Sequence, residues 1–186
     1  SKVFVPGFRV GWVVAHREIV SKMSVAKQSA DLCSNSLGQK LAYRAAATGF
    51  LEHHLRRLPG FYRPRRDAMI EAAERMFPRG VEFSRPRGGF FVLVRLPRVV
   101  DAASMLPRAV ANNVAYVPGK GFYVDGSGAN TMRLAFSQAS PDEIRLGVER
   151  LAATLDQELE AIARSSSPRL EKDGRLAGAL RQEFGA

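Results

Sequence analysis

Three basic residues of this 186-residue chain have side chains that could do chemistry. Lys2 carries a primary amine that, in its neutral form, can attack a carbonyl group and then act as a general acid or base. The guanidinium of Arg9, seven residues later, has a planar fork suited to a phosphate dianion. Arg133 stands between Met132 and Leu134, where an arginine is costly unless an anion such as a carboxylate pairs with it. Each also has a plain structural interpretation: a solvated chain-end lysine, an edge-strand arginine facing water and a structural salt bridge.

Cysteine and histidine offer little further chemistry. The single cysteine, Cys33, excludes an internal disulfide and a multi-cysteine metal cage, and it favours a reducing cytosol. His16, His53 and His54 lack the spacing of metal ligands, so no metal site is expected. The pair His53-His54 beside residues 56–57, both arginines, is typical of an exposed helix face.

Composition and charge define the broad class. Hydrophobic residues make up 46% and charged residues 25%, as in ordinary globular proteins, which excludes disorder and low complexity for the bulk of the chain. No apolar run approaches the roughly 20 residues of a membrane helix, so no membrane partner is expected. The net charge of +10 points to an anionic partner, but only six basic residues are lysines and the arginines are spread along the chain. A nucleic-acid partner is therefore not expected.

The first part of the chain must position Lys2 and Arg9. An extended stretch ends at the turn signal Pro6-Gly7, and a mostly apolar, β-prone run predicts a buried strand. Spacings of three and four residues then predict helices, with a break at Leu58-Pro59-Gly60. The expected elements are a strand over 8–15, helices over about 17–29 and 37–47, and a long amphipathic helix over 61–77.

The second part must position Arg133. Short β-prone runs alternate with turns and one helical pattern, and the strand that carries Arg133 is the last of them. The expected strands cover 81–83, 90–96, 114–117 and 131–136, with a helix over 101–112 and a glycine-rich loop over 119–130. Residues 140–143 form a helix cap, followed by an apolar stripe at helical spacing. Strands with helices between and after them predict an α/β layer.

The chain is expected to be a piece of a longer polypeptide. It enters a strand-like run within a few residues of Ser1, and natural domains rarely begin inside an element. The first 50 residues therefore belong to a lobe that is mostly absent here. After Arg164, a Ser-Ser-Ser-Pro linker and a polar tail to Ala186 are expected to be loosely ordered.

Four segments, in order, resemble fold-type I pyridoxal-phosphate aminotransferases of class I/II. The Ser-Lys pair followed by Pro-Gly, Arg and Gly-Trp resembles the lysine segment of that family. The others resemble its Gly-Gly-aromatic strand entry, its Val-Pro-Gly strand end and its Asn-x-x-Arg-Leu strand. The segments cover residues 1–12, 85–92, 113–119 and 130–137. The subgroup they resemble is that of the 2-aminoadipate and aromatic aminotransferases.

The resemblance implies a role for each basic residue. Lys2 would hold pyridoxal 5′-phosphate as an aldimine and move the proton between substrate and cofactor, while the cofactor supplies the electron sink. Arg9 and Ser1 would bind the cofactor, with Arg9 on its phosphate. Arg133 would bind the substrate α-carboxylate through both arms of its guanidinium.

The resemblance also implies an organisation and a function. Residues 1–50 would end the large cofactor-binding lobe, residues 51–164 would form the small C-terminal α/β domain, and residues 165–186 would be a flexible tail. The full-length protein would be a cytoplasmic, homodimeric transaminase acting on an amino acid and a 2-oxo acid, and the fragment alone would be inactive. The alternative is an aminotransferase-like effector domain of a DNA-binding transcription regulator, which can keep all three basic residues.

Overall fold

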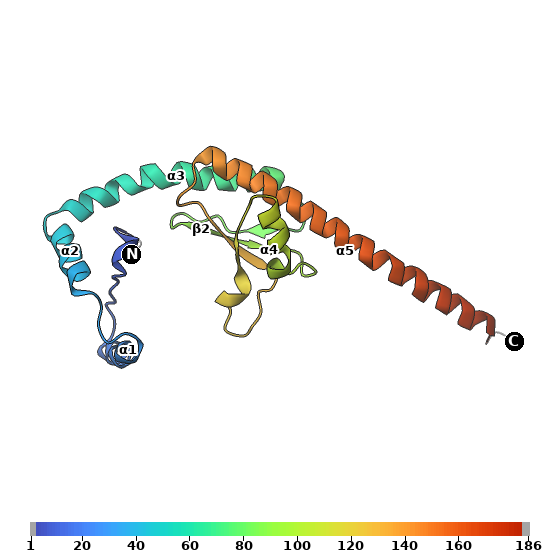
Figure 1. Ribbon diagram of the computed structural model, residues 1–186, viewed down its shortest axis with the longest axis horizontal. Helices are drawn as coiled ribbons and strands as arrows, with labels where there is room; N and C mark the ends of the chain where they lie inside the picture. The colour runs from blue at the N-terminus through green and yellow to red at the C-terminus, as the bar shows by residue number, and fades with distance from the viewer. Residues whose placement is uncertain (1–2, 184–186) are drawn as a thin grey trace. The chain divides into compact units, whose positions relative to one another are not determined.

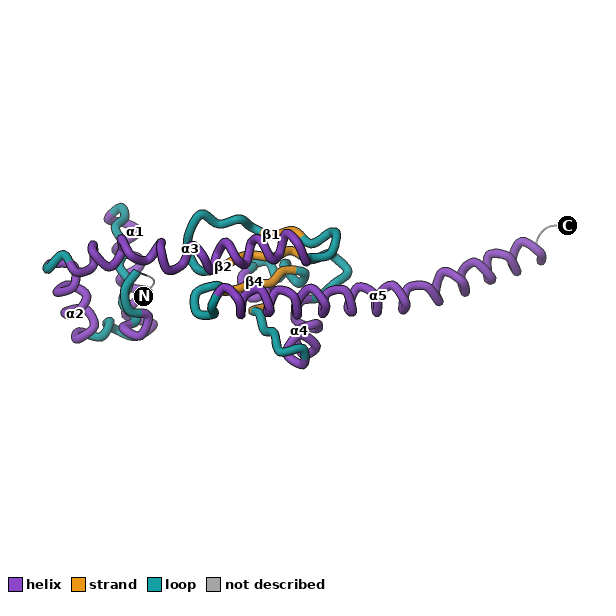
Figure 2. The backbone as a smooth tube through the Cα atoms, turned by 90° about the horizontal axis from the view of Figure 1, so that it is seen from above, coloured by secondary structure: helices purple, strands orange, loops and turns teal. Residues whose placement is uncertain are grey.

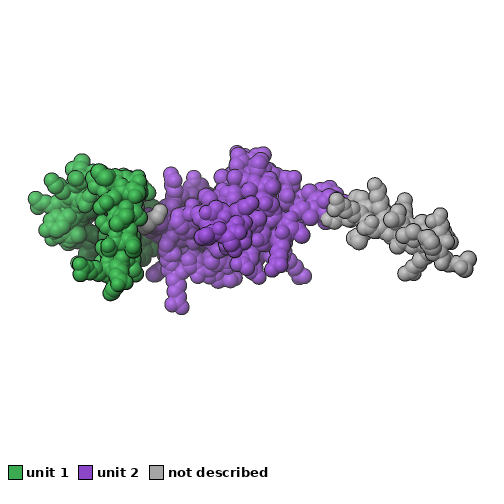
Figure 3. Space-filling view, turned by 90° about the horizontal axis from the view of Figure 1, so that it is seen from below, with its two compact units in different colours: residues 1–61 green, residues 62–186 purple. Residues whose placement is uncertain are grey.

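The computed structural model describes residues 3–183, with side chains up to residue 165. It divides the chain into two compact units, residues 1–61 and residues 62–186, which are coloured separately in Figure 3. The division falls inside one helix, α3, whereas the sequence places the boundary between the two lobes at residue 50. The assignment of the two units to lobes remains a prediction.

The first unit is helical. It contains a 3₁₀ turn η1 (Pro6–Phe8), helices α1 (Arg17–Ala30) and α2 (Ser36–Ala47), and the start of α3 (Phe50–Met76). The side chain of Asn35 caps α2, because its Oδ1 accepts hydrogen bonds from the backbone N–H groups of Leu37 and Gly38 at 3.0 and 3.2 Å. Helices α1 and α2 lie close to the ranges predicted for them. Helix α1 has no buried residue, so its apolar side chains have no core in the described chain.

The strand predicted over residues 8–15 does not form, and that expectation is wrong for this chain. Phe8 closes η1, and residues 9–16 run without regular structure and are mostly exposed. A β-strand needs a neighbouring strand to pair its backbone N–H and C=O groups. No described segment lies beside these residues as a strand, so their β propensity has no partner to act on.

The helix break predicted at Leu58-Pro59-Gly60 is also wrong. Helix α3 runs without interruption from Phe50 to Met76 and passes through Pro59, Gly60 and Pro64. A proline inside a helix removes one hydrogen bond and its ring crowds the carbonyl of residue i−4, at a cost of about 3 kcal/mol, while its φ stays near the helical value. Helix α3 continues through both prolines over its 27 residues, so this local cost does not end it.

The second unit is built on a small antiparallel sheet. Its strands are β1 (Glu82–Phe83), β2 (Phe91–Arg95), β3 (Val117–Pro118) and β4 (Thr131–Ala135), in the order β1-β2-β4-β3. All four fall at or beside the positions predicted from the sequence. The central pair β2–β4 places Leu93 opposite Arg133. Together with the helices, this sheet makes the mixed α/β fold expected from the sequence.

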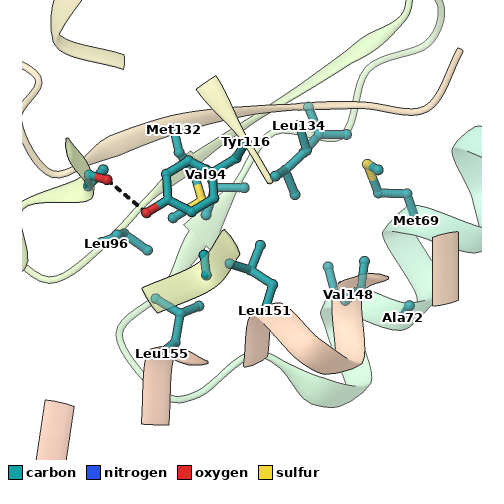
Figure 4. Close-up of a cluster of buried hydrophobic side chains, with 14 of the residues drawn as sticks. Met69, Ala72, Val94, Leu96, Tyr116, Met132, Leu134, Val148, Leu151 and Leu155 are labelled. Carbon is teal, nitrogen blue, oxygen red and sulfur yellow. Dashed lines mark hydrogen bonds between the residues drawn. The ribbon is translucent and has the colours of Figure 1, made fainter. Parts of the chain in front are cut away.

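One face of the sheet carries the core. Helices α3 and α5 (Pro141–Glu183) run over the strands, and α4 (Ala102–Ala111) lies beside them (Figures 1 and 2). Alternate residues of β2 and β4 meet the apolar stripes of α3 and α5 in the cluster drawn in Figure 4. The buried set includes Met69, Ala72, Val92, Val94, Met132, Leu134, Ile144, Val148, Leu151 and Leu155. The stripes predicted for both helices are therefore confirmed.

Local capping fixes where α4 and α5 begin. The Oδ1 of Asp101 accepts from the N–H groups of Ala103 and Ser104 at 2.8 and 2.9 Å. Ser140 and Glu143 bond reciprocally, with the Ser140 N–H donating to Glu143 Oε2 at 2.7 Å and the Glu143 N–H to Ser140 Oγ at 3.3 Å. This capping box begins α5 where the sequence predicts a cap.

Helix α5 continues past its predicted end. It runs to Glu183, through the Ser-Ser-Ser-Pro segment where the sequence predicts a linker. That predicted break does not occur, and the flexibility expected for residues 165–186 remains a prediction. None of the helices in the described part of the chain combines the length and apolar character needed to span a bilayer.

Candidate active site

Arg133 lies on the face of the sheet opposite the core. Its neighbours in β4, Met132 and Leu134, are buried under the helices, so the alternation of a strand turns Arg133 the other way. Leu93 of β2 and Val117 of β3 stand beside it on the adjacent strands. The strand position predicted for this arginine is confirmed, and its surroundings in the sheet are apolar.

Two aromatic rings lie against the guanidinium of Arg133. Its Cζ atom lies 4.2 Å from the ring centroid of Phe91 and 4.8 Å from that of Phe122. Both distances fall within the range of cation–π contacts. The Nε atom of Arg133 is buried and has no hydrogen-bond partner in the structure.

No acidic side chain of the described residues forms a salt bridge with Arg133. A structural ion pair within this part of the chain therefore does not account for the arginine. An arginine in apolar surroundings with a buried, unsatisfied donor favours an anionic ligand. The planar fork suits a carboxylate that approaches in the plane of the guanidinium.

A tightly closed turn brings Phe122 to this site. Phe122 ends the 3₁₀ turn η2 (Gly119–Phe122), which directly follows β3. Gly119 at the start of the turn is buried, and a Cβ atom added there would overlap the Oγ1 atom of Thr131 in β4. Only glycine lets the turn approach β4 this closely. Sequence reasoning missed Phe91 and Phe122 as neighbours of Arg133, although the Val-Pro-Gly signal before the turn was visible.

Arg9, in the first unit, has an unusual backbone conformation, and most N–H groups of its side chain remain available to a ligand. Its φ of 52° lies in the left-handed region, which is uncommon for a non-glycine residue. Its backbone N–H and its Nη1 both bond to the carbonyl oxygen of Pro6, at 3.2 and 3.3 Å. The side chain is exposed and joins no salt bridge with a described residue. Its remaining donors fit an anionic group such as a phosphate.

The other candidate residues add no second site. Ser1 and Lys2 lie outside the described residues. Cys33, His16 and His53 are exposed, and no group of three or more potential metal ligands occurs in the described chain.

Comparison with known proteins identifies the family of the chain. The model of the family "Aminotransferase class I and II" matches residues 1–151. The aromatic-amino-acid aminotransferase 1 of Thermococcus litoralis is 44% identical over 160 residues, which are 86% of this chain and 38% of that protein. The chain thus spans about two fifths of the length of the curated relatives it matches.

Solved structures give the same result. The multiple substrate aminotransferase of Thermococcus profundus is 48% identical, with a TM-score of 0.77 over 86% of this chain and 40% of that one. LysN, the α-aminoadipate aminotransferase of Thermus thermophilus, complexed with N-(5′-phosphopyridoxyl)-L-leucine, is 40% identical. Its TM-score is 0.77 over 87% of this chain and 41% of that chain. The matched segments, the fold and these relatives together show that the chain belongs to the aminotransferase class I and II family.

Proposed function

We propose that this chain is the C-terminal part of a pyridoxal-phosphate-dependent aminotransferase that moves an amino group from an amino acid to a 2-oxo acid. The observation that carries the proposal is Arg133, an arginine with a buried, unsatisfied Nε on an apolar sheet face. The α-carboxylate is common to both substrates of this reaction, so one arginine can serve both half-reactions. Arg133 binds that carboxylate through the edge of its guanidinium.

The cofactor assignment is supported by the family and by LysN, which was solved with a phosphopyridoxyl compound. When bound, pyridoxal phosphate supplies the electron sink for the reaction. Arg9 holds its phosphate through the donors that Pro6 leaves free, and Ser1 is a further cofactor-binding residue. Lys2 holds the cofactor through its Nζ atom and carries the proton to and from the substrate Cα.

Exposed apolar side chains in the first unit support the proposal that further protein covers it. Trp12, Val13 and Val14 are exposed, as are Ile19 and Met23 of α1. Apolar side chains at this density are normally covered. We propose that the remainder of the cofactor-binding lobe, and a second subunit of a homodimer against α1 and α2, cover them in the complete protein. A cytoplasmic location remains a prediction from the single cysteine.

The regulator alternative is the less supported of the two functions. The relatives at 41–44% identity are aminotransferases, whereas two transcriptional regulators of Bacillus subtilis match at only 25% and 27%. A regulator would bind the cofactor on Lys2 without turning over an amino acid. Turnover by the complete protein therefore separates the two functions.

The test is to locate the cofactor and measure turnover in the complete protein. Reduction with borohydride followed by peptide mapping should place the cofactor on Lys2. Lys2→Ala should keep the cofactor bound non-covalently and remove nearly all turnover, because one amine serves as both anchor and proton carrier. Lys172→Ala, beyond the residues 1–151 that the family model matches, is the matched control and should change neither. Attachment at another lysine would overturn the proposal, and attachment at Lys2 without turnover would favour the regulator.

A further inference from the structure

We propose that Phe91 and Phe122 are positioning residues that hold the guanidinium of Arg133 in a fixed plane, so that it meets a carboxylate only through its edge. The inference rests on the proposed function and goes further, because it assigns a role to two residues that the family motifs leave as scaffold and loop. The two rings act through Arg133 and need no contact with the reacting atoms.

The geometry of the two contacts is the first support. Phe91 of β2 pairs with Ala135 of β4, two positions from Arg133, so its ring reaches the arginine diagonally across the strand pair. Phe122 approaches from the turn after β3, on the other side of β4 in the sheet order. With Cζ at 4.2 and 4.8 Å from the two ring centroids, the arginine touches one ring from each flanking segment.

The second support is what the rings do to the donors of the arginine. A guanidinium has five N–H donors, all in its plane, while its two faces carry no donor and can stack on aromatic rings. Rings against it stabilise the cation without using any of those donors. The buried Nε shows that solvent has been removed from part of the group. What remains for a ligand is the in-plane edge, which matches the two oxygens of a carboxylate.

The third support is that the position of Phe122 is built into the fold. Its side chain is 52% exposed, so burial in the core does not hold it in place. The turn that carries it is instead placed by Gly119 against Thr131. A half-exposed phenylalanine on a closely docked turn is suited to covering the arginine.

The same sheet supplies a matched control. Arg85 lies 4.8 Å from the ring centroid of Phe83, which equals the distance between Arg133 and Phe122. Arg85 also forms a salt bridge with Glu74, so its charge is already paired. Phe83→Leu removes an arginine–phenylalanine stack of equal length without touching Arg133.

The first experiment measures kcat/KM of the complete enzyme for an amino acid and for its decarboxylated amine. Phe122→Leu should lower kcat/KM for the amino acid by roughly twofold to thirtyfold, mainly through KM, and leave the amine unchanged. Phe122→Tyr keeps a ring and should restore the wild-type value. Phe91→Leu should act in the same direction, and Phe83→Leu should leave the ratio of the two substrates unchanged.

The second experiment needs no turnover. In a ¹H–¹⁵N spectrum of the complete protein labelled on arginine, the Nε–H of Arg133, identified by its absence in Arg133→Lys, should be shifted upfield by the two rings. Phe122→Leu should reverse part of that shift, and Phe83→Leu should not. A normal shift in the wild-type chain would show that the stack does not form and would overturn the proposal.

The kinetic outcomes separate this inference from the proposed function. If Arg133→Lys selectively impairs the amino acid while Phe122→Leu and Phe91→Leu do not, the positioning role is wrong and the function stands. If Arg133→Lys also leaves kcat/KM for the amino acid unchanged, the carboxylate role and the positioning role are both wrong. If the leucine variants impair amino acid and amine equally, the rings are structural and the inference is again overturned.

Discussion

Arg133 and Phe91 stand on adjacent antiparallel strands two positions out of register, and the guanidinium lies 4.2 Å from the centre of the ring. The contact is on the sheet face away from the helices, where a charged side chain would ordinarily extend into solvent. Here it stays against the sheet, with its Nε buried and unbonded. An arginine held in this way is better explained by a ligand than by stability.

Arg133→Lys keeps the charge and loses the planar fork. In the complete enzyme, kcat/KM for amino acids should fall by about tenfold to a hundredfold, because a charged hydrogen-bond pair contributes roughly 1.5 to 3 kcal/mol. The decarboxylated amine should be a poor substrate of the wild type and change little in the variant. Kinetics on both substrates, with the melting temperature as a control, decide the matter. Equal losses on both substrates together with a lower melting temperature would show a structural role.

Asp101 should stabilise α4 in a pH-dependent way. Hydrogen bonds from the backbone N–H of Ser104, and then of Ala103, hold the pKa of its carboxyl below the ordinary value of 3.8. A lowered pKa means that the stabilisation is present above pH 3.8 and is lost as the pH falls through the folded-state pKa. Asp101→Ala should therefore lower the free energy of unfolding by about 1 kcal/mol at pH 7, and this difference should shrink near pH 3.

The measurement is denaturant unfolding of both proteins at several pH values. Asp101→Asn, which keeps an accepting oxygen without a titrating group, is the matched control and should retain most of the cap at every pH. A difference between wild type and Asp101→Ala that stays constant down to pH 3 would argue against the charged cap.

The stabilisation that Tyr116 contributes should depend on pH in the opposite direction, with its loss at high pH. Its hydroxyl donates to the Ala102 carbonyl at 2.7 Å inside the core, as the dashed line in Figure 4 shows, and burial raises the pKa of the phenol above its ordinary value of 10.0. A raised pKa means that the stabilisation is complete below pH 10 and is lost as the pH rises through the folded-state value. Tyr116→Phe should cost about 1 to 3 kcal/mol at pH 7, since the buried carbonyl loses its partner.

Absorbance titration near 295 nm can check the raised pKa of Tyr116, which should ionise only above its ordinary value of 10.0. Tyr43, by contrast, has an exposed side chain. Tyr43→Phe is the matched control for removal of a hydroxyl and should leave the free energy of unfolding within about 0.5 kcal/mol of wild type. Ionisation of Tyr116 at or below pH 10.0 in the folded chain, identified by its loss in Tyr116→Phe, would contradict the buried hydrogen bond.

Amide hydrogen exchange in the isolated chain should be fast in the first unit and slow in the core of the second unit. The core residues of the second unit, from Ala68 to Leu155, are almost completely buried, whereas α1 has no buried residue and α2 buries only Gly38. Amides of residues 1–50 should exchange fast, and those of β2, β4 and the first turns of α5 should be protected. Uniform protection along the chain would show that the first unit is stable without further protein around it.

The sequence by itself determined the parts of this protein that depend on neighbouring residues. Ser140 and Glu143 are three residues apart, so their capping box could be read directly, as could the apolar stripe of α5. Period-two alternation likewise placed Arg133 in a strand between two buried neighbours. The motifs around it were sufficient to indicate the family.

Tertiary structure decided the features that depend on partners far along the chain. The run over residues 8–15 has strand propensity but finds no strand to pair with, so it stays irregular. Arg133 meets Phe91 because β2 and β4 pair in one register, and it meets Phe122 because η2 docks closely through Gly119. Strand register and turn docking are set by packing between segments that are distant in the sequence, and no local pattern encodes them. Phe91 and Arg133, for example, are about 40 residues apart.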